Sequence, residues 1–319
     1  MREAGMRLSG GRELAATLGL SGAALDPRCA SCDGTGIALP EVWKELIDDL
    51  APAFQRRPSV DPALDQSHGT LETALRRAAY LLSQGLLLGK RLLVLGDDDF
   101  TSLAAAALAG KVAPTQTSLT SIQVLEIDER YLSLLREDAE RRGLSLETQL
   151  YDAREPLPDA LHRRADVFIT DPPYTLEGLS LFLSRGLHGL DRSQTRDVLL
   201  SYPQRPPIQN WELQYAMLEL GLSILRVFPG FNRYHGAAMH ANVSTLYHLQ
   251  VTPAASPLHQ GKWKHAIYTG EHRPATRYRC KGCRHEVRVG RDGEFTTVRD
   301  LKSAGCPECG GRVFLRVGK

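Results

Sequence analysis

The feature that most constrains the fold is a regular alternation of short apolar segments with helices, which begins after residue 60. The strand candidates are Arg91–Gly96, Ile122–Ile127, Glu147–Tyr151, Val167–Thr170 and Asp197–Tyr202. Helix candidates with apolar residues at three- and four-residue spacing lie between several of them, at Ser102–Ala109, Glu129–Arg142 and Leu176–Gly186. This alternation favours an α/β fold in which helices cover both faces of a parallel sheet.

Two further strand candidates, Ser223–Phe228 and Ser244–Val251, end this region and predict an antiparallel pair at the edge of the sheet. An amphipathic helix, TLETALRRAAYLLSQG, precedes the first strand. Together these elements have the outline of the Rossmann-like, class I sheet found in S-adenosylmethionine-dependent transferases. We expect this domain to occupy residues 61–255.

Residues 1–60 predict a small N-terminal helical unit. The segments GRELAATLGLS and PEVWKELIDDLAPAF both have the apolar spacing of helices. The first could belong to a winged-helix-like unit, and a cap of packed helices explains it equally well. Cys29 and Cys32 form a C-x-x-C pair here; they could bind a metal or be buried thiols beside a glycine-rich turn, and we favour a structural role.

Two C-x-x-C pairs near the C-terminus predict a zinc ribbon at residues 270–319. Cys280 and Cys283 are followed, after 22 intervening residues, by Cys306 and Cys309, and four thiolates suit a closed tetrahedral zinc site. From residue 273 onwards the chain holds 12 basic and 5 acidic residues, whereas the remainder holds 27 basic and 32 acidic residues. The basic ribbon could bind nucleic acid, pack on the acidic body or close the active site.

Acidic residues follow four of the predicted strands, at the edge where ligands bind in such sheets. Asp97–Asp99 follows the first strand, Glu126 ends the second, Asp152 follows the third and Asp171 follows the fourth. We assign Glu126 to the two hydroxyls of a ribose, because a carboxylate accepts two hydrogen bonds from a diol, and Asp152 to an adenine amino group. One such acid alone would be read as a solvated loop residue; four in register predict a site.

The three consecutive aspartates predict a cationic ligand. They would repel the carboxylate of S-adenosylmethionine, whereas decarboxylated S-adenosylmethionine keeps the amine and the sulfonium and lacks the carboxylate. A polyamine would be attracted in the same way. The alternative is that Asp98 or Asp99 caps the helix FTSLAAAALAG, a role that we expect for one of the three acids.

Three blocks of the sequence resemble one known family. GKRLLVLGDDDFTSLAAAALAG, VLEIDERYLSLL and DAREPLPDALHRRADVFITDPPYTLEGLSLFLSRGL are similar in order and spacing to the branched-chain polyamine synthases, or bis(aminopropyl)spermidine synthases. The resemblance covers roughly residues 61–251, and the zinc ribbon is an addition to it. It implies transfer of an aminopropyl group from decarboxylated S-adenosylmethionine to an amine of a spermidine-like polyamine, giving a branched product.

The segment after the fourth strand predicts the chemistry of this transfer. A polyamine nitrogen is mostly protonated at neutral pH and then has no lone pair, so we expect Asp171 to accept its proton or hold the neutral amine. Tyr174 can offer an aromatic face to a cation, and Asp98 can hold the chain of one substrate. The residues expected to contact the donor are Gly96, Asp97, Glu126, Asp152 and Pro172. The alternative is that Asp171-Pro172-Pro173 forms only a rigid turn.

The alternative function is an S-adenosylmethionine-dependent amino-group methyltransferase that acts on nucleic acid. The DPPY motif can hold an exocyclic amine, and the ribbon would present the nucleic acid. The three aspartates and the net charge of −5 on the body disfavour a polyanion. A non-catalytic zinc-ribbon scaffold would leave the acids at four strand ends unexplained.

Other bounds concern location and assembly. No apolar run reaches the roughly eighteen residues of a membrane span, and the N-terminus lacks the apolar region of a signal peptide, so we expect a cytoplasmic protein that does not enter membranes. It could form a homo-oligomer. The acceptor amine and the number of transfers are not specified by any pattern.

Overall fold

A computed structural model of the chain describes Ile37, Leu39 and residues 43–113, 120–235, 242–272, 276–290, 293–295 and 298–317. Its centre is an eight-stranded sheet in the order β1-β7-β8-β6-β5-β2-β3-β4. Five strands are parallel: β2 (Arg91–Leu95), β3 (Ser121–Glu126), β4 (Glu147–Leu150), β5 (Val167–Thr170) and β6 (Asp197–Tyr202). The remaining three are β1 (His68–Gly69), β7 (Leu222–His235) and β8 (Val243–Val251), and they pair antiparallel.

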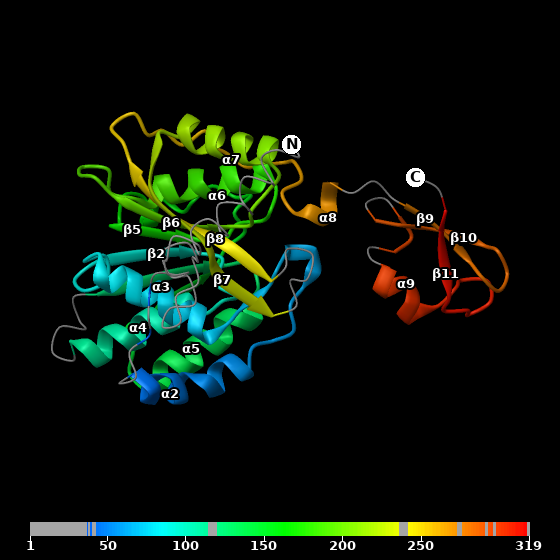
Figure 1. The fold of residues 1–319 in the computed structure, drawn as a ribbon, viewed down its shortest axis with the longest axis horizontal. Coiled ribbons are helices and arrows are strands. Elements are labelled where there is room, and N and C mark those ends of the chain that lie inside the picture. The colour runs from blue at the N-terminus through cyan, green and yellow to red at the C-terminus, as the bar shows by residue number, and fades with distance from the viewer. Residues whose placement is uncertain are drawn as a thin grey trace, which may run out of the picture.

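Helices cover both faces of this sheet, as expected. Figure 1 shows α6 and α7 on one face and α2 to α5 on the other, and each group has its own core against the sheet. Their bounds are α2 (Lys44–Gln55), α3 (Leu71–Ser83), α4 (Thr101–Val112), α5 (Glu129–Arg142), α6 (Leu176–Gly189) and α7 (Pro207–Glu219). Three short helices complete this part of the chain: the 3-10 helices η3 (Pro62–Leu64) and η5 (Asp159–Leu161), and the α-helix α8 (Thr269–His272). The predicted fold class is therefore confirmed.

Local sequence accounts for where the main helices begin and end. Thr70 caps α3, and its side chain accepts a hydrogen bond from the Thr73 amide. Asp128 caps α5 through the Arg130 amide, and Gly143 ends that helix with a φ of 64°. On the other face, α6 lies so close to the sheet that a Cβ on Gly186 would come within 2.2 Å of the Phe168 ring.

The sequence predicted the element ends of the parallel sheet within one or two residues, and it predicted the antiparallel final pair. The last strand, β8, is inserted between β6 and β7, so β7 and the two-residue β1 form that edge. Neither β1 nor α7 was predicted. A two-residue strand leaves no periodic pattern, and α7 exposes much of its apolar surface: Ile208, Trp211, Tyr215 and Leu218. The segment GRELAATLGLS and the pair Cys29 and Cys32 lie outside the described residues.

The N-terminal unit is represented by α2. Leu46, Leu50 and Phe54 of this helix are buried in the same core as α3, α4 and α5. The domain boundaries drawn from the sequence stay predictions, and within the described residues α2 packs as part of the main body.

The C-terminal segment forms a second, three-stranded sheet in the order β10-β9-β11. Its elements are β9 (Thr276–Cys280), β10 (Glu286–Val289), α9 (Val298–Ala304) and β11 (Phe314–Val317). Figure 1 shows this small sheet beyond α8, beside the main body. Its buried apolar cluster among the described residues consists of Val287, Val289 and Leu301. Because so small a core stabilises a fold weakly, a bound metal would supply much of the stability of this segment.

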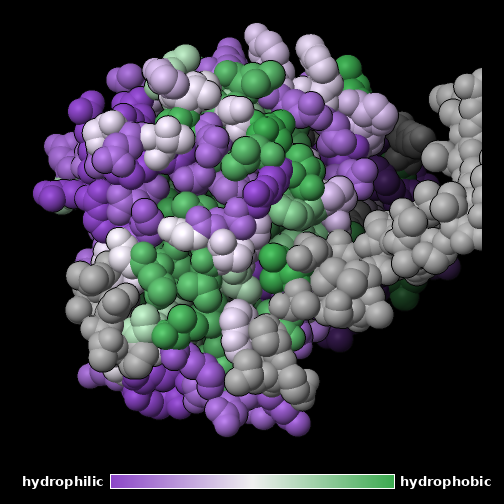
Figure 2. Space-filling view, turned by 60° about the vertical axis from the view of Figure 1, so that its left-hand side comes forward, coloured by the Kyte–Doolittle hydropathy of each residue, from purple (hydrophilic) through white to green (hydrophobic). Residues whose placement is uncertain are grey.

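In the part of the chain that the structure describes, none of the helices combines the length and the apolarity that crossing a bilayer requires. Figure 2 shows patches of apolar side chains set among hydrophilic ones on one face of the body. Self-association stays a prediction.

Candidate active site

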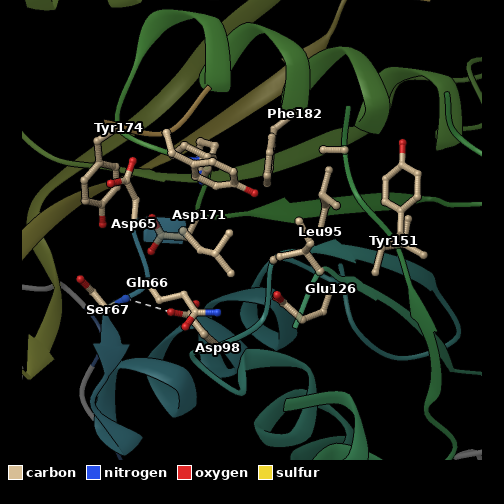
Figure 3. Close-up of a pocket in the computed structure, with 18 residues that line it drawn as sticks. Asp65, Gln66, Ser67, Leu95, Asp98, Glu126, Tyr151, Asp171, Tyr174 and Phe182 are labelled. Carbon is tan, nitrogen blue, oxygen red and sulfur yellow. Dashed lines mark hydrogen bonds between the residues drawn. The ribbon is translucent and has the colours of Figure 1, made fainter. Parts of the chain in front are cut away.

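A cleft lies at the carboxyl ends of β2, β3 and β5 and holds about 580 Å³ of free space, counted with its open mouth. One end is apolar and the other is acidic (Figure 3). The apolar end includes Leu95, Tyr151 and Phe182. The lining carboxylates are those of Asp65, Asp98, Glu126 and Asp171, and among the described residues the lining includes no lysine, arginine or histidine. Four acids that line one cleft favour a cationic ligand there.

The three consecutive aspartates point in three directions. Asp98 lines the cleft, where its carboxylate accepts a hydrogen bond from the Ser67 amide at 2.9 Å. Asp97 is 1% exposed and accepts from the amide and the hydroxyl of Ser102 in the first turn of α4. Asp99 is also buried: it accepts from the Gly69 amide and forms an ion pair with Arg77 at 2.5 Å.

These contacts correct the prediction for the capping acid. We expected Asp98 or Asp99 to bind the start of the helix, but Asp97 does so. The cause is Phe100, which precedes α4 with a φ of 57°. This left-handed residue turns the chain back, so the Asp97 side chain reaches the Ser102 amide. Among the three aspartates, only Asp98 belongs to the lining of the cleft.

Glu126 and Asp152, both assigned to the donor, lie differently. Glu126 lines the cleft and is 4% exposed; its carboxylate accepts from the amides of Asp97 at 2.8 Å and Asp128 at 3.0 Å. Asp152 accepts from the Arg154 guanidinium instead and lines a neighbouring cavity. Its chain neighbours Tyr151 and Ala153 line the main cleft. The structure thus brings Gly96, Asp98, Glu126, Asp171, Pro172 and Tyr174 together and places the carboxylates of Asp97 and Asp152 outside this group.

Asp171 follows β5, and its two carboxylate oxygens have different surroundings. Its Oδ2 accepts the Tyr234 hydroxyl at 2.5 Å and Nη2 of Arg77 at 3.2 Å. Its Oδ1 is buried and has no hydrogen-bond partner among the described residues. Burial, reinforced by the charge of Asp99, raises the pKa of Asp171 to about 7, whereas Arg77 and Tyr234 oppose this rise. A carboxylate with such a pKa can exchange a proton at neutral pH.

Two other cleft acids, Asp98 and Glu126, also have raised pKa values. Burial first, and then the charges of Asp99, Glu126 and Asp171, raises the pKa of Asp98 well above its usual value. Burial also raises the pKa of Glu126. Burial therefore makes ionised carboxylates costly in the cleft, and a bound cation would stabilise them.

Tyr174 forms one wall of the acidic end. Its ring packs edge-on against Tyr202, with centroids 5.7 Å apart, and the Arg205 guanidinium lies 5.9 Å from its centroid. Arg205 also donates to the Tyr174 carbonyl at 2.7 Å. The predicted contact between this ring and a substrate cation stays a prediction.

Sequence reasoning missed four residues of the site: Asp65, Tyr268, Arg77 and Tyr234. Asp65 follows η3 with a φ of 55°, and it accepts from the Thr269 amide at 2.7 Å. This hydrogen bond holds the segment that leads to the second sheet beside the cleft. Tyr268, which belongs to this segment, lines the cleft. An isolated acid in a loop and an arginine within an amphipathic helix follow no pattern that would single them out.

The four C-terminal cysteines come together as predicted. The Sγ atoms of Cys280, Cys283, Cys306 and Cys309 all lie within 4.8 Å of one another. Two of the pairs, Cys280 with Cys309 and Cys283 with Cys306, are 3.6 and 3.5 Å apart. Zinc–sulfur bonds of about 2.3 Å in a tetrahedron require sulfurs roughly 3.8 Å apart, so this donor set fits a structural zinc ion.

The topology, with β8 inserted antiparallel beside β6 and an acidic cleft at the ends of β2, β3 and β5, is that of the Rossmann-like fold found in S-adenosylmethionine-dependent transferases. The model of the branched-chain polyamine synthase A C-terminal domain matches residues 45–275, well over half of the chain. The chain therefore belongs to the branched-chain polyamine synthase family.

Similar proteins support this membership. An N(4)-bis(aminopropyl)spermidine synthase of Thermococcus kodakarensis is 33% identical over 227 residues, which cover 70% of this chain and 62% of that enzyme. The chain thus spans less than two thirds of that relative. A crystal structure of the branched-chain polyamine synthase from Thermus thermophilus, in complex with N4-aminopropylspermidine and 5'-methylthioadenosine, matches with a TM-score of 0.65 and 28% identity. That match covers 76% of this chain and 74% of that one.

An uncharacterized protein of Methanocaldococcus jannaschii is similar over more of the chain. It is 37% identical over 291 residues, covering 91% of this chain and 69% of that protein. The part of this chain left uncovered is shorter than the cysteine-bearing segment, so the similarity includes residues of the predicted zinc ribbon.

Proposed function

We propose that this protein transfers an aminopropyl group from decarboxylated S-adenosylmethionine to an amine of a linear polyamine and so forms a branched polyamine. The observation that carries the proposal is the cleft with four lining carboxylates and, in the part of the chain that the structure describes, no lining basic side chain. Donor and acceptor are both cations, and each needs such a lining. Family membership and the polyamine-synthase names of the relatives support the same reaction.

The two ends of the cleft suit the two parts of the donor (Figure 3). The nucleoside would lie at the apolar end among Leu95, Tyr151 and Phe182, with its ribose hydroxyls donating to Glu126. The sulfonium and the aminopropyl chain would then extend toward Asp98 and Asp171. Electrostatic attraction at this end favours the decarboxylated donor, because S-adenosylmethionine would bring a carboxylate against these acids.

Asp171 would act on the acceptor. The leaving group is a neutral thioether released from a sulfonium, so it needs no acid. The nucleophile needs a lone pair, and Asp171 can remove the proton that blocks it. Asp98 would hold the polyamine chain, and the rigid Pro172-Pro173 backbone would keep Asp171 in line with the reacting carbon.

The test is a product analysis with the whole chain. Each of the two donors is combined with a panel of linear polyamines, and the products are identified by mass, with release of 5'-methylthioadenosine as the second readout. We expect branched products from the decarboxylated donor alone. Methylated nucleic acid formed from S-adenosylmethionine, without aminopropylated amines, would instead establish the methyltransferase alternative.

We also propose that the basic C-terminal segment contacts a polyanion such as nucleic acid. Arg277, Arg279 and Arg288 are exposed on β9 and β10, although Glu286 pairs with the first two. Binding of single-stranded RNA that weakens steeply with salt would support this contact. Equal binding by an Arg288→Glu variant would count against it.

A further inference from the structure

The Oδ2 atom of Asp171 lies in a buried hydrogen-bond network whose members come from distant parts of the chain. Arg77 comes from α3, Asp99 from the turn after β2, and Tyr234 from β7. Nη1 of Arg77 donates to Asp99 at 2.5 Å and to Thr101 at 3.0 Å, and Nε donates to Asn232 at 2.8 Å. The Arg77 side chain is 3% exposed. These contacts therefore hold its guanidinium in one position.

The Tyr234 hydroxyl has its hydrogen-bonding capacity fully used. It lies 3.2 Å from Nη2 of Arg77, which can only donate. It also lies 2.9 Å from the hydroxyl of Ser244, whose oxygen already accepts from Asn232 at 2.9 Å. Because the single hydrogen of the Tyr234 hydroxyl is directed to Oδ2 of Asp171, the Ser244 hydroxyl donates to the Tyr234 oxygen.

The two oxygens of Asp171 therefore differ in their hydrogen bonds. Oδ2 receives two hydrogen bonds, one from the Arg77 guanidinium, which can only donate, and one from the Tyr234 hydroxyl, whose oxygen already accepts from Arg77 and Ser244. Oδ1 receives none from the described residues and belongs to a residue that lines the cleft. We propose that Arg77 and Tyr234 are positioning residues that occupy Oδ2 of Asp171 and leave Oδ1 as the single oxygen that receives a proton from the acceptor amine. This inference rests on the proposed function.

The resulting step balances in atoms and charge. A secondary ammonium of the acceptor gives one proton to Oδ1 and becomes a neutral amine. Its lone pair forms the new carbon–nitrogen bond as the carbon–sulfur pair moves to sulfur, which yields a neutral thioether. The product nitrogen keeps its remaining hydrogen and carries the positive charge that the sulfonium lost. The proton on Oδ1 leaves through the cleft after the product.

The charges around Asp171 set the direction of the pH effect. Asp99 and Asp98 are the neighbouring acids, Arg77 is the neighbouring base, and Tyr174 and Tyr234 are the neighbouring phenols. Removing the Tyr234 hydroxyl removes a hydrogen bond to the charged carboxylate, so the pKa of Asp171 must rise above about 7. The ascending limb of activity against pH must then move to higher pH.

Tyr234→Phe tests this without requiring turnover. Infrared titration of the whole chain reports the carboxylic-acid band of Asp171, identified by its loss in Asp171→Asn. A pKa higher by roughly one unit corresponds to about fivefold less ionised Asp171 at pH 7 and little difference near pH 9. We expect the transfer rate to fall by the same factor at pH 7 and to recover at high pH, with donor affinity retained.

Tyr80→Phe is the matched control. Tyr80 is equally buried, and its hydroxyl bonds to His248 away from the cleft, so its loss should leave the titration of Asp171 in place. If Tyr234→Phe does not fold, Ser244→Ala removes the donor to the Tyr234 oxygen and should shift the titration in the same direction. An unshifted titration in the folded variant refutes the positioning role. Absence of transfer by the parental protein refutes the proposed function alone.

Discussion

Discrimination between the two donors gives the sharpest test of the cleft electrostatics. Replacing decarboxylated S-adenosylmethionine by S-adenosylmethionine adds one carboxylate at the acidic end, where Asp98 and Asp171 have raised pKa values because burial and mutual repulsion disfavour their charges. A unit charge roughly 6 Å from one ionised carboxylate, at an effective dielectric of about 20, is repelled by about 3 kcal/mol. That energy corresponds to roughly a hundredfold difference in Kd.

Calorimetry with both donors measures this ratio in the parental protein and in Asp98→Asn. The repulsion energy is worked out for one ionised carboxylate, because the raised pKa values of Asp98 and Asp171 leave these two acids partly neutral before binding. Asp98→Asn should lower the ratio to about tenfold or less. Asp159→Asn removes a fully exposed acid of η5 and should leave the ratio unchanged. Added salt should reduce the ratio only slightly, because buried charges are poorly screened.

Two results would refute this reasoning. Equal affinities, or tighter binding of S-adenosylmethionine, would show that the cleft acids do not face the end of the donor that carries the carboxylate. An unchanged ratio in Asp98→Asn would show that discrimination has another source.

Four further predictions concern the acids of the cleft and the cysteines of the ribbon. Affinity for the decarboxylated donor should fall in calorimetry as the pH falls through the raised pKa of Asp98, because protons then compete with the cation. Asp171→Asn should reduce turnover by roughly a hundredfold or more in a steady-state assay and keep donor affinity within a few-fold; near-parental turnover would remove its role as base. Glu126→Gln should weaken donor binding through the ribose hydroxyls, and unchanged calorimetry would contradict that assignment. Metal analysis should find about one zinc per chain, and Cys306→Ser should lose it and become protease-sensitive beyond Gly270; full metal retention would contradict the ribbon.

Much of the fold could be predicted because its signals are local. The ends of β5, β6 and α5 agree with the sequence pattern, since buried parallel strands are short apolar runs and helices carry their own caps. The metal cluster was predictable for a related reason: two C-x-x-C pairs already fix most of the geometry of four thiolates. The insertion of β8 between β6 and β7 has no such signal, because the order of strands depends on which edges remain free when the sheet assembles.

Local patterns in the sequence place acids after the strands of a parallel sheet, and these acids therefore gather at one edge. Which of the acids face the ligand depends on contacts between distant parts of the chain. The neighbours Asp97, Asp98 and Asp99 have separate partners because Phe100 turns the chain in the left-handed conformation. The partners of Asp171 lie 94 and 63 residues away, at Arg77 and Tyr234. Hydrogen bonds over such separations depend on how α3 and β7 pack against the sheet, and a local pattern carries no information about that packing.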